Sequence, residues 1–183
     1  MTDNSGPRAI LVTGGARSGK SRFAEKLAED SGLQKVYLAT GAAHDGEMSE
    51  RIALHRNRRD GSWQTVEEPL DLCAALRREC SPGRVVLVDC LTLWLSNLLF
   101  ADKDIAAETN GLCHALSALP GSCIFVSNEV GMGIVPENRL SRTFRDAQGR
   151  LNQDMAQACG KVVFVAAGLP FLLKPSSQAE IRL

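Results

Sequence analysis

The sequence has no excess of charge of either sign and few aromatic residues. Its 183 residues contain 21 Lys and Arg against 21 Asp and Glu, and only 5% of them are aromatic. A general nucleic-acid binder carries a basic excess, and a platform for single strands carries stacking aromatic side chains. The composition therefore argues against a nucleic-acid partner and favours a soluble enzyme with a small-molecule substrate.

The sequence also offers no candidate for a membrane span or a signal peptide. The longest apolar stretch, Val85 to Phe100, is interrupted by polar residues and falls short of the roughly 18 residues of a spanning helix. Residues 1–7 are polar and lack the apolar core of a signal peptide. None of the six cysteines belongs to a CxxC pair. We therefore expect a cytoplasmic protein with reduced, buried thiols.

Short apolar runs rich in β-branched residues alternate with amphipathic stretches. The runs predict strands at 8–13, 35–40, 85–89, 122–127, 161–166 and 169–174. The stretches predict helices at 18–31, 47–60, 70–79, 91–119 with a break at 102–104, and 137–158 with an interruption near Gly149. Continuously apolar strands between helices indicate an α/β fold, with a mainly parallel sheet covered by helices on both faces. We expect an antiparallel final strand pair, and one domain over residues 1–183 with flexible ends at 1–7 and 175–183.

A glycine-rich segment between the first predicted strand and helix fits the phosphate-loop pattern GxxxxGK[ST]. It consists of Gly14, Gly15, Ala16, Arg17, Ser18, Gly19, Lys20 and Ser21. Backbone N–H groups of such a loop surround nucleotide phosphates, the lysine neutralises the β- and γ-phosphates, and the hydroxyl holds Mg²⁺. Asp89, at the end of the run VVLVD, is the candidate second Mg²⁺ carboxylate. The alternative role for an Asp after a strand is to cap the next helix. The segment predicts a P-loop NTPase-type domain.

One histidine lies on an arginine-rich helical face. Arg51, His55 and Arg59 are spaced i, i+4 and i+8, so they share one side of the predicted helix. Nearby guanidinium groups disfavour a second positive charge, which keeps the imidazole of His55 neutral and able to act as a nucleophile. The alternative is an exposed basic helix with an incidental histidine.

Several segments together resemble the bifunctional adenosylcobinamide kinase/adenosylcobinamide-phosphate guanylyltransferase family of cobalamin biosynthesis. The matching segments are ILVTGGARSGKSRFAE (10–25), YLAT (37–40), EMSERIALHRNRR (47–59), WQTVEEP (63–69), VLVDCLTLWLSNLL (86–99) and SNEVGMGIVPENRLSRTFRDAQGRLNQ (127–153). The resemblance implies phosphorylation of adenosylcobinamide by ATP or GTP, with Mg²⁺. It further implies transfer of GMP from GTP through a covalent histidine to adenosylcobinamide phosphate, and a homotrimer. The position that matches the histidine is His55.

The resemblance also implies nucleotide contacts outside the phosphate loop. The matching positions are Thr40, Gly41, Ala42, Arg56, Asn57, Arg58, Arg59, Glu67 and Asp89. Residues 40–42 are equally compatible with a plain strand-to-loop turn, and the role of Glu67 could belong to Glu68. Asn128, Glu129 and Arg139 are candidates for contacting the corrinoid or orienting water, or for capping helices or sealing a subunit interface.

Two other functions are compatible with a phosphate loop. One is a single-activity small-molecule kinase in which His55 has no chemical role. The other is a nucleotide-responsive binding module that changes its affinity for a partner. A histidine labelled by GTP would distinguish the bifunctional enzyme from both.

Overall fold

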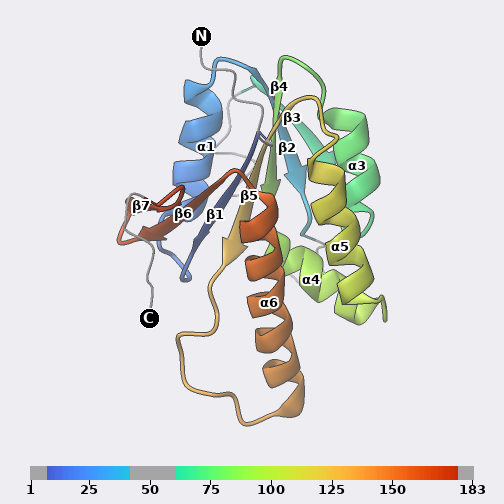
Figure 1. Cartoon of the computed structure of the whole chain (residues 1–183), viewed down its shortest axis with the longest axis vertical. Helices are drawn as coiled ribbons and strands as arrows, with labels where there is room; N and C mark the ends of the chain where they lie inside the picture. Colours follow the sequence, from blue (N-terminus) through green and yellow to red (C-terminus); the bar gives the residue numbers. More distant parts are fainter. Residues whose placement is uncertain (1–7, 42–60, 177–183) are drawn as a thin grey trace.

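The structure, a computed structural model, describes residues 8–41 and 61–176. The strands of these ranges form one sheet in the order β3-β2-β4-β5-β1-β6-β7 (Figure 1). They are β1 (Ala9–Gly14), β2 (Gln34–Ala39), β3 (Trp63–Glu67), β4 (Arg84–Asp89), β5 (Ser122–Asn128), β6 (Lys161–Ala166) and β7 (Leu169–Lys174). Neighbouring strands run parallel except for β6 and β7, which are antiparallel. The predicted mainly parallel sheet with an antiparallel final pair is confirmed.

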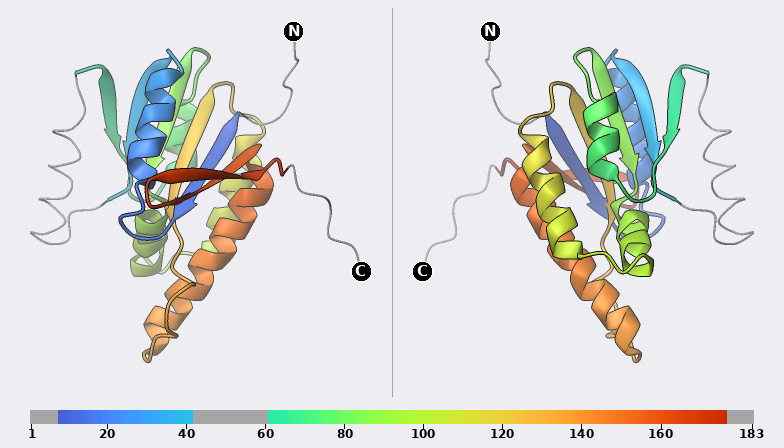
Figure 2. Two further views of the ribbon diagram at one scale, coloured as in Figure 1. Left: turned by 90° about the vertical axis from the view of Figure 1, so that its left-hand side faces the viewer. Right: turned by 90° about the vertical axis from the view of Figure 1, so that its right-hand side faces the viewer.

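Helices cover both faces of this sheet, as predicted (Figures 1 and 2). They are α1 (Lys20–Asp30), α3 (Leu72–Glu79), α4 (Leu91–Phe100), α5 (Ile105–Leu116) and α6 (Arg139–Ala158). Helix α1 packs on one face, and α3, α4, α5 and α6 pack on the other. No helix within the described ranges has the length and apolar character needed to cross a bilayer. The helix predicted at 47–60 and the ends at 1–7 and 177–183 lie outside the described residues.

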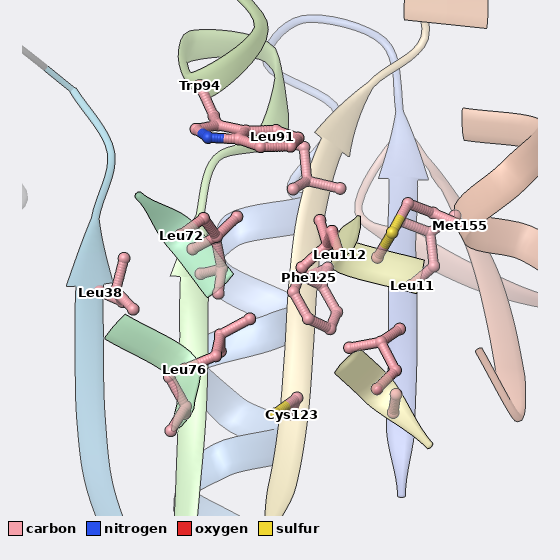
Figure 3. Close-up of a cluster of buried hydrophobic side chains, with 14 of the residues drawn as sticks. Leu11, Leu38, Leu72, Leu76, Leu91, Trp94, Leu112, Cys123, Phe125 and Met155 are labelled. Carbon is pink, nitrogen blue, oxygen red and sulfur yellow. The ribbon is translucent and has the colours of Figure 1, made fainter. Parts of the chain in front are cut away.

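Alternation along the strands divides the core into two clusters, one on each face of the sheet. In β5, Phe125 faces the cluster of α3 to α6, whereas Val126 faces the cluster under α1. Figure 3 shows the larger cluster, in which Phe125 lies among leucines from strands and helices. Trp94 of α4 is fully buried there, and its indole N–H donates to the Leu70 carbonyl oxygen at 2.9 Å. Apolar residues at adjacent strand positions thus fill both layers, as a doubly covered sheet requires.

Two sequence predictions of local structure were wrong. Strand β3 was missed because it is a short edge strand of five residues whose side chains are mostly exposed, so it lacks an apolar run. Helix α6 runs without interruption past Gly149. The buried side chains of Gln148, Leu151 and Met155 anchor both sides of that glycine, and this tertiary packing outweighs its cost of about 1 kcal/mol.

The break predicted within 91–119 is confirmed, since α4 ends at Phe100 and α5 begins at Ile105. All six cysteines are unpaired, as expected, but only four are buried, and Cys73 and Cys113 are half-buried. The Sγ atoms of Cys80 and Cys123 lie 3.2 Å apart as hydrogen-bonded thiols.

The C-terminal strand is fastened to the long helix by one lysine. The Lys174 ammonium group donates to the carbonyl oxygens of Ala156, Gln157 and Cys159 at 2.9, 2.8 and 2.8 Å. These carbonyls belong to the last turn of α6 and its cap, where helical partners run out and the helix dipole favours a positive charge. Lys174 therefore caps α6 and holds β7 against its end.

We expect Lys174→Met to lower the free energy of unfolding by about 1–2 kcal/mol, because charge-assisted hydrogen bonds to a helix end are lost. Denaturant unfolding followed by circular dichroism measures this loss. The matched control is Lys161→Met at the exposed start of β6. Equal stability of the two variants would contradict the capping role.

Candidate active site

The parallel register brings the carboxyl ends of six strands, β1 to β6, to one edge of the sheet. Gly14 pairs with Asn128 at the ends of β1 and β5. Ala39 of β2 pairs with both Asp89 of β4 and Glu67 of β3. Ligands of open α/β sheets bind at this edge. The edge thus unites the predicted phosphate loop with the two predicted carboxylates, although these lie far apart in the sequence.

The phosphate loop leaves β1 in close contact with β6. A Cβ atom at Gly14 would lie 2.3 Å from the Val165 carbonyl oxygen, so no other residue fits without moving the backbone. Gly19, just before α1, has a φ of 96°, which favours glycine. A Cβ atom at Gly15 would meet no described atom within 4 Å, so the loop is open on that side.

The turn between β6 and β7 packs directly on this loop. Ala167 and Gly168 both have positive φ angles, 52° and 80°, as in a tight hairpin turn. The Gly168 N–H donates to the Ser18 carbonyl oxygen at 2.8 Å. A Cβ atom at Gly19 would lie 3.1 Å from the Gly168 Cα atom. The hairpin therefore supports the loop from the side opposite its opening.

Lys20, the predicted phosphate-binding cation, is the first residue of α1 and is 7% exposed. Its ammonium group donates to the Gly15 carbonyl oxygen at 2.9 Å, which turns the side chain back along the loop. Burial lowers the pKa of Lys20, and the nearby acidic groups of Cys90 and Asp89 oppose this shift. Burial raises the pKa of the Cys90 thiol to about 12, so this thiol carries no charge at neutral pH.

Asp89 ends β4 and points to the same side of the sheet as Tyr37 of β2. The Tyr37 hydroxyl donates to Asp89 Oδ2 at 2.8 Å and so orients the carboxylate. Ser21, the second predicted Mg²⁺ residue, lies in the first turn of α1 with a half-buried side chain. A carboxylate and a hydroxyl are the oxygen donors that Mg²⁺ takes beside nucleotide phosphates, so these residues fit the ion.

Thr40 fastens the end of β2 to the residue after Asp89. Its buried hydroxyl donates to the Cys90 carbonyl oxygen at 2.7 Å and accepts from the Cys90 N–H at 2.9 Å. The Asn97 amide of α4 in turn donates to the Thr40 carbonyl oxygen at 2.7 Å. These bonds engage the hydroxyl within the protein, so Thr40 acts here by positioning Asp89 and Gly41. Direct contact of residues 40–41 with a nucleotide stays a prediction.

The structure distinguishes the two adjacent acids at the end of β3. The Glu68 carboxylate accepts from the N–H groups of Leu70 and Asp71 at 3.0 and 2.9 Å, which shapes the turn before α3. Glu67 is exposed at the carboxyl edge. Of the two, Glu67 is the one whose carboxylate is available to a ligand.

Part of the predicted site falls in the segment that the structure leaves undescribed. These residues are Ala42, His55, Arg56, Asn57, Arg58 and Arg59. Gly41, the last described residue before them, follows Thr40 at the carboxyl edge.

The side chains that hold the strand ends could not be identified from the sequence. They are those of Tyr37, Thr92, Gln148 and Asn152. A polar residue within a strand or on a helix face gives no signal of which strand end it will meet. Among the motif residues left open, the Glu129 carboxylate accepts from the Gly131 N–H. Arg139 is the first residue of α6, and the helix is capped by its neighbour Asn138, which accepts from the Ser141 N–H.

A groove between α5 and α6 has a volume of about 450 Å³ but contains none of the predicted site residues. Its polar lining comes from residues such as Asp104, Asp146, Arg150 and Asp154. In the described ranges, no three His, Cys, Asp or Glu residues gather as a metal cluster. The carboxyl edge therefore remains the candidate active site.

Comparison with known proteins agrees with this assignment. The family described as "Cobinamide kinase / cobinamide phosphate guanyltransferase" (CobU) matches residues 10–173. The bifunctional adenosylcobalamin biosynthesis protein CobP of Pseudomonas aeruginosa is 54% identical over 166 residues, which cover 90% of this chain and 96% of that protein. The bifunctional adenosylcobalamin biosynthesis protein CobU of Escherichia coli K12 is 45% identical over 180 residues, with 90% and 99% covered.

Among solved structures, the flagellar accessory protein FlaH of Methanocaldococcus jannaschii superposes with a TM-score of 0.50 at 12% identity, covering 91% of this chain and 77% of FlaH. This likeness concerns the fold alone, which is of the P-loop NTPase type. The family match spans the phosphate loop, Asp89 and the segments of the carboxyl edge, and the chain therefore belongs to the cobinamide kinase/cobinamide phosphate guanyltransferase family.

Proposed function

We propose that this protein phosphorylates adenosylcobinamide and then converts the product to adenosylcobinamide-GDP in adenosylcobalamin biosynthesis. The observation that carries the proposal is the convergence of the phosphate loop, Lys20 and Asp89 at one sheet edge, in a chain of this family. A nucleoside triphosphate, ATP or GTP, donates the phosphoryl group in the first step, and GTP donates GMP in the second.

The described residues supply what phosphoryl transfer requires. The substrate hydroxyl forms a bond to the γ-phosphorus while the bond to the leaving oxygen of the nucleoside diphosphate breaks. The loop N–H groups and Lys20 neutralise the charge on the phosphates. For this, the Lys20 ammonium group exchanges its bond to the Gly15 carbonyl oxygen for phosphate oxygens. Ser21 and Asp89 would hold Mg²⁺, which would neutralise further negative charge on the phosphates.

We assign the second step to His55. An imidazole nitrogen of His55 bonds to the α-phosphorus of GTP, and pyrophosphate leaves with the electron pair of the broken bond. An oxygen of adenosylcobinamide phosphate then bonds to the same phosphorus, and the imidazole leaves. Arg51 and Arg59, at helical spacing from His55, keep the free imidazole neutral and attract phosphates. The position of Gly41 at the carboxyl edge supports this assignment, because the chain enters the His55 segment from there.

We also propose that the protein is a homo-oligomer, a trimer by family resemblance. Strand β7 supports this because it is an edge strand that exposes apolar side chains. Leu169, Phe171, Leu172 and Leu173 are between 53% and 62% exposed. Several exposed large apolar side chains on one edge strand favour an interaction site.

The kinase step depends on Lys20. We expect Lys20→Met to lower kcat/KM for phosphorylation of adenosylcobinamide at least about 100-fold, because the buried charge facing the transferred group is lost. Transfer of label from γ-labelled ATP or GTP measures the rate. The control is Lys26→Met, an exposed lysine of the same helix that pairs with Asp30. Activity of Lys20→Met equal to that of the control would refute the role.

The guanylyl step depends on His55. Incubation with GTP labelled at the α-phosphate, followed by denaturation, is expected to leave acid-labile, base-stable label on the chain. His55→Ala removes this label but retains kinase activity, because the nucleophile serves only the second step. His114→Ala, at the exposed histidine of α5, labels like the wild type. An unlabelled wild type, or equal labelling of His55→Ala, would exclude the covalent mechanism.

The assembly depends on β7. We expect a solution mass of a trimer for the wild type and of a monomer for Phe171→Glu, because a charge in an apolar interface is left unpaired. Light scattering after size exclusion measures both. Phe100→Glu, at the end of α4, controls for the loss of an exposed phenylalanine. A monomeric wild type, or a Phe171→Glu variant that keeps its mass, would contradict the assignment.

A further inference from the structure

The backbone of Asn128 is held on both sides at the carboxyl end of β5. Its N–H donates to the Thr92 hydroxyl of α4 at 2.9 Å. Its carbonyl oxygen accepts from the Asn152 amide of α6 at 3.0 Å. The next N–H, of Glu129, donates to the Gly14 carbonyl oxygen at 2.9 Å. Asn128 is thereby fixed relative to α4, α6 and the start of the phosphate loop.

A buried polar network fixes the orientation of Asn152 in turn. Asn152 Oδ1 accepts from the Ser127 hydroxyl at 2.6 Å and from Gln148 Nε2 at 3.0 Å. Gln148 Nε2 also donates to the Ser127 hydroxyl oxygen at 3.0 Å. Since Oδ1 receives both donors, the amide nitrogen of Asn152 is the atom that faces the Asn128 carbonyl oxygen. Ser127 and Gln148 are fully buried, and an interior network of this kind holds its members rigidly.

Strand alternation puts the Asn128 side chain on the side of the phosphate loop. Val126 packs under α1, and Ser127 faces α6 through its bonds to Gln148 and Asn152. Asn128 therefore faces the α1 side. Asp89 lies on the same side, where it accepts from Tyr37, and Lys20 begins α1. Because β5 lies between β4 and β1, Asn128 stands between the carboxylate and the phosphate loop.

The carboxamide of Asn128 is half-buried and makes no hydrogen bond to other side chains or backbone within the described residues. By contrast, its backbone N–H and carbonyl oxygen are both hydrogen-bonded, to Thr92 and Asn152. A rigidly held amide with unused donors, next to a phosphate loop, is suited to a phosphate oxygen.

We propose that the Asn128 carboxamide donates a hydrogen bond to the γ-phosphoryl group while it is transferred, with Thr92 and Asn152 as positioning residues. This inference rests on the proposed kinase function. The acceptor hydroxyl oxygen bonds to the γ-phosphorus, its proton passes to solvent water, and the nucleoside diphosphate leaves with the electron pair of the broken bond. Asn128 exchanges no proton. Its N–H stabilises the equatorial oxygens, which carry the charge of the transition state.

The experiment compares the full-length wild type with Asn128→Ala and Asn128→Asp. Initial rates of transfer from γ-labelled ATP or GTP to adenosylcobinamide give kcat and the KM for the nucleotide. We expect Asn128→Ala to lower kcat on the order of 100-fold with KM changed less than about threefold, as for a donor that acts in the transition state. Asn128→Asp is isosteric but replaces the donor by a negative charge beside phosphates. It is therefore expected to be at least as slow as the alanine variant.

Asn110→Ala, at an exposed position of α5, is the control and is expected to match the wild type. Thermal melting of each variant shows whether the fold is retained. A wild type without phosphoryl transfer would refute the proposed function. An active wild type with Asn128→Ala within about threefold of it, or with Asn128→Asp as fast as the wild type, would overturn this inference alone.

The positioning role is tested separately at Thr92. Thr92→Val keeps the side-chain shape but removes the acceptor of the Asn128 N–H. We expect kcat to fall about tenfold and Thr92→Ser to restore it, while the melting temperatures of the two variants stay alike. Equal kcat values for the valine and serine variants would overturn the positioning role.

Discussion

The contact between Gly14 and β6 is the constraint on which the site depends. The Val165 carbonyl oxygen occupies the space where any side chain at position 14 would begin. This contact lets β1 turn immediately into the phosphate loop and brings the loop against the β6–β7 turn, where Gly168 donates to Ser18. The antiparallel pair β6–β7 is therefore part of the support of the candidate nucleotide site. Lys174, which ties β7 to the last turn of α6, extends this support to the long helix.

The electrostatics of the site are local and do not follow from the charge of the whole chain. Positive and negative residues balance in number, yet the phosphate loop places a buried ammonium group beside one carboxylate. Burial disfavours the charged form of Lys20, and the Asp89 charge opposes that effect. The negative charge of a bound triphosphate would further stabilise this ammonium group. Asp89 thus offsets only part of the cost of burying the Lys20 charge, and bound phosphates would offset more of it.

The fold and the phosphate loop could be predicted from the sequence because their signals are local. Apolar runs such as 85–89 identify buried strands, and the spacing from Gly14 to Ser21 identifies the loop. Strand β3 and the continuity of α6 past Gly149 could not be predicted, because both depend on tertiary pairing and packing. The hydrogen bonds of Tyr37 with Asp89 and of Asn128 with Thr92 and Asn152 could not be predicted either. They join residues 24 to 52 positions apart in the sequence, and no local sequence pattern indicates such distant pairs.

We expect nucleotide phosphates to bind at the carboxyl edge, between the phosphate loop and the ends of β4 and β5. A crystal structure of the protein with a non-hydrolysable GTP analogue tests it most directly. The γ-phosphate should lie within hydrogen-bond distance of Lys20 Nζ and the Asn128 carboxamide, with Lys20 released from the Gly15 carbonyl oxygen. Phosphates bound elsewhere, for example in the groove between α5 and α6, with the bond from Lys20 to Gly15 intact, would contradict it.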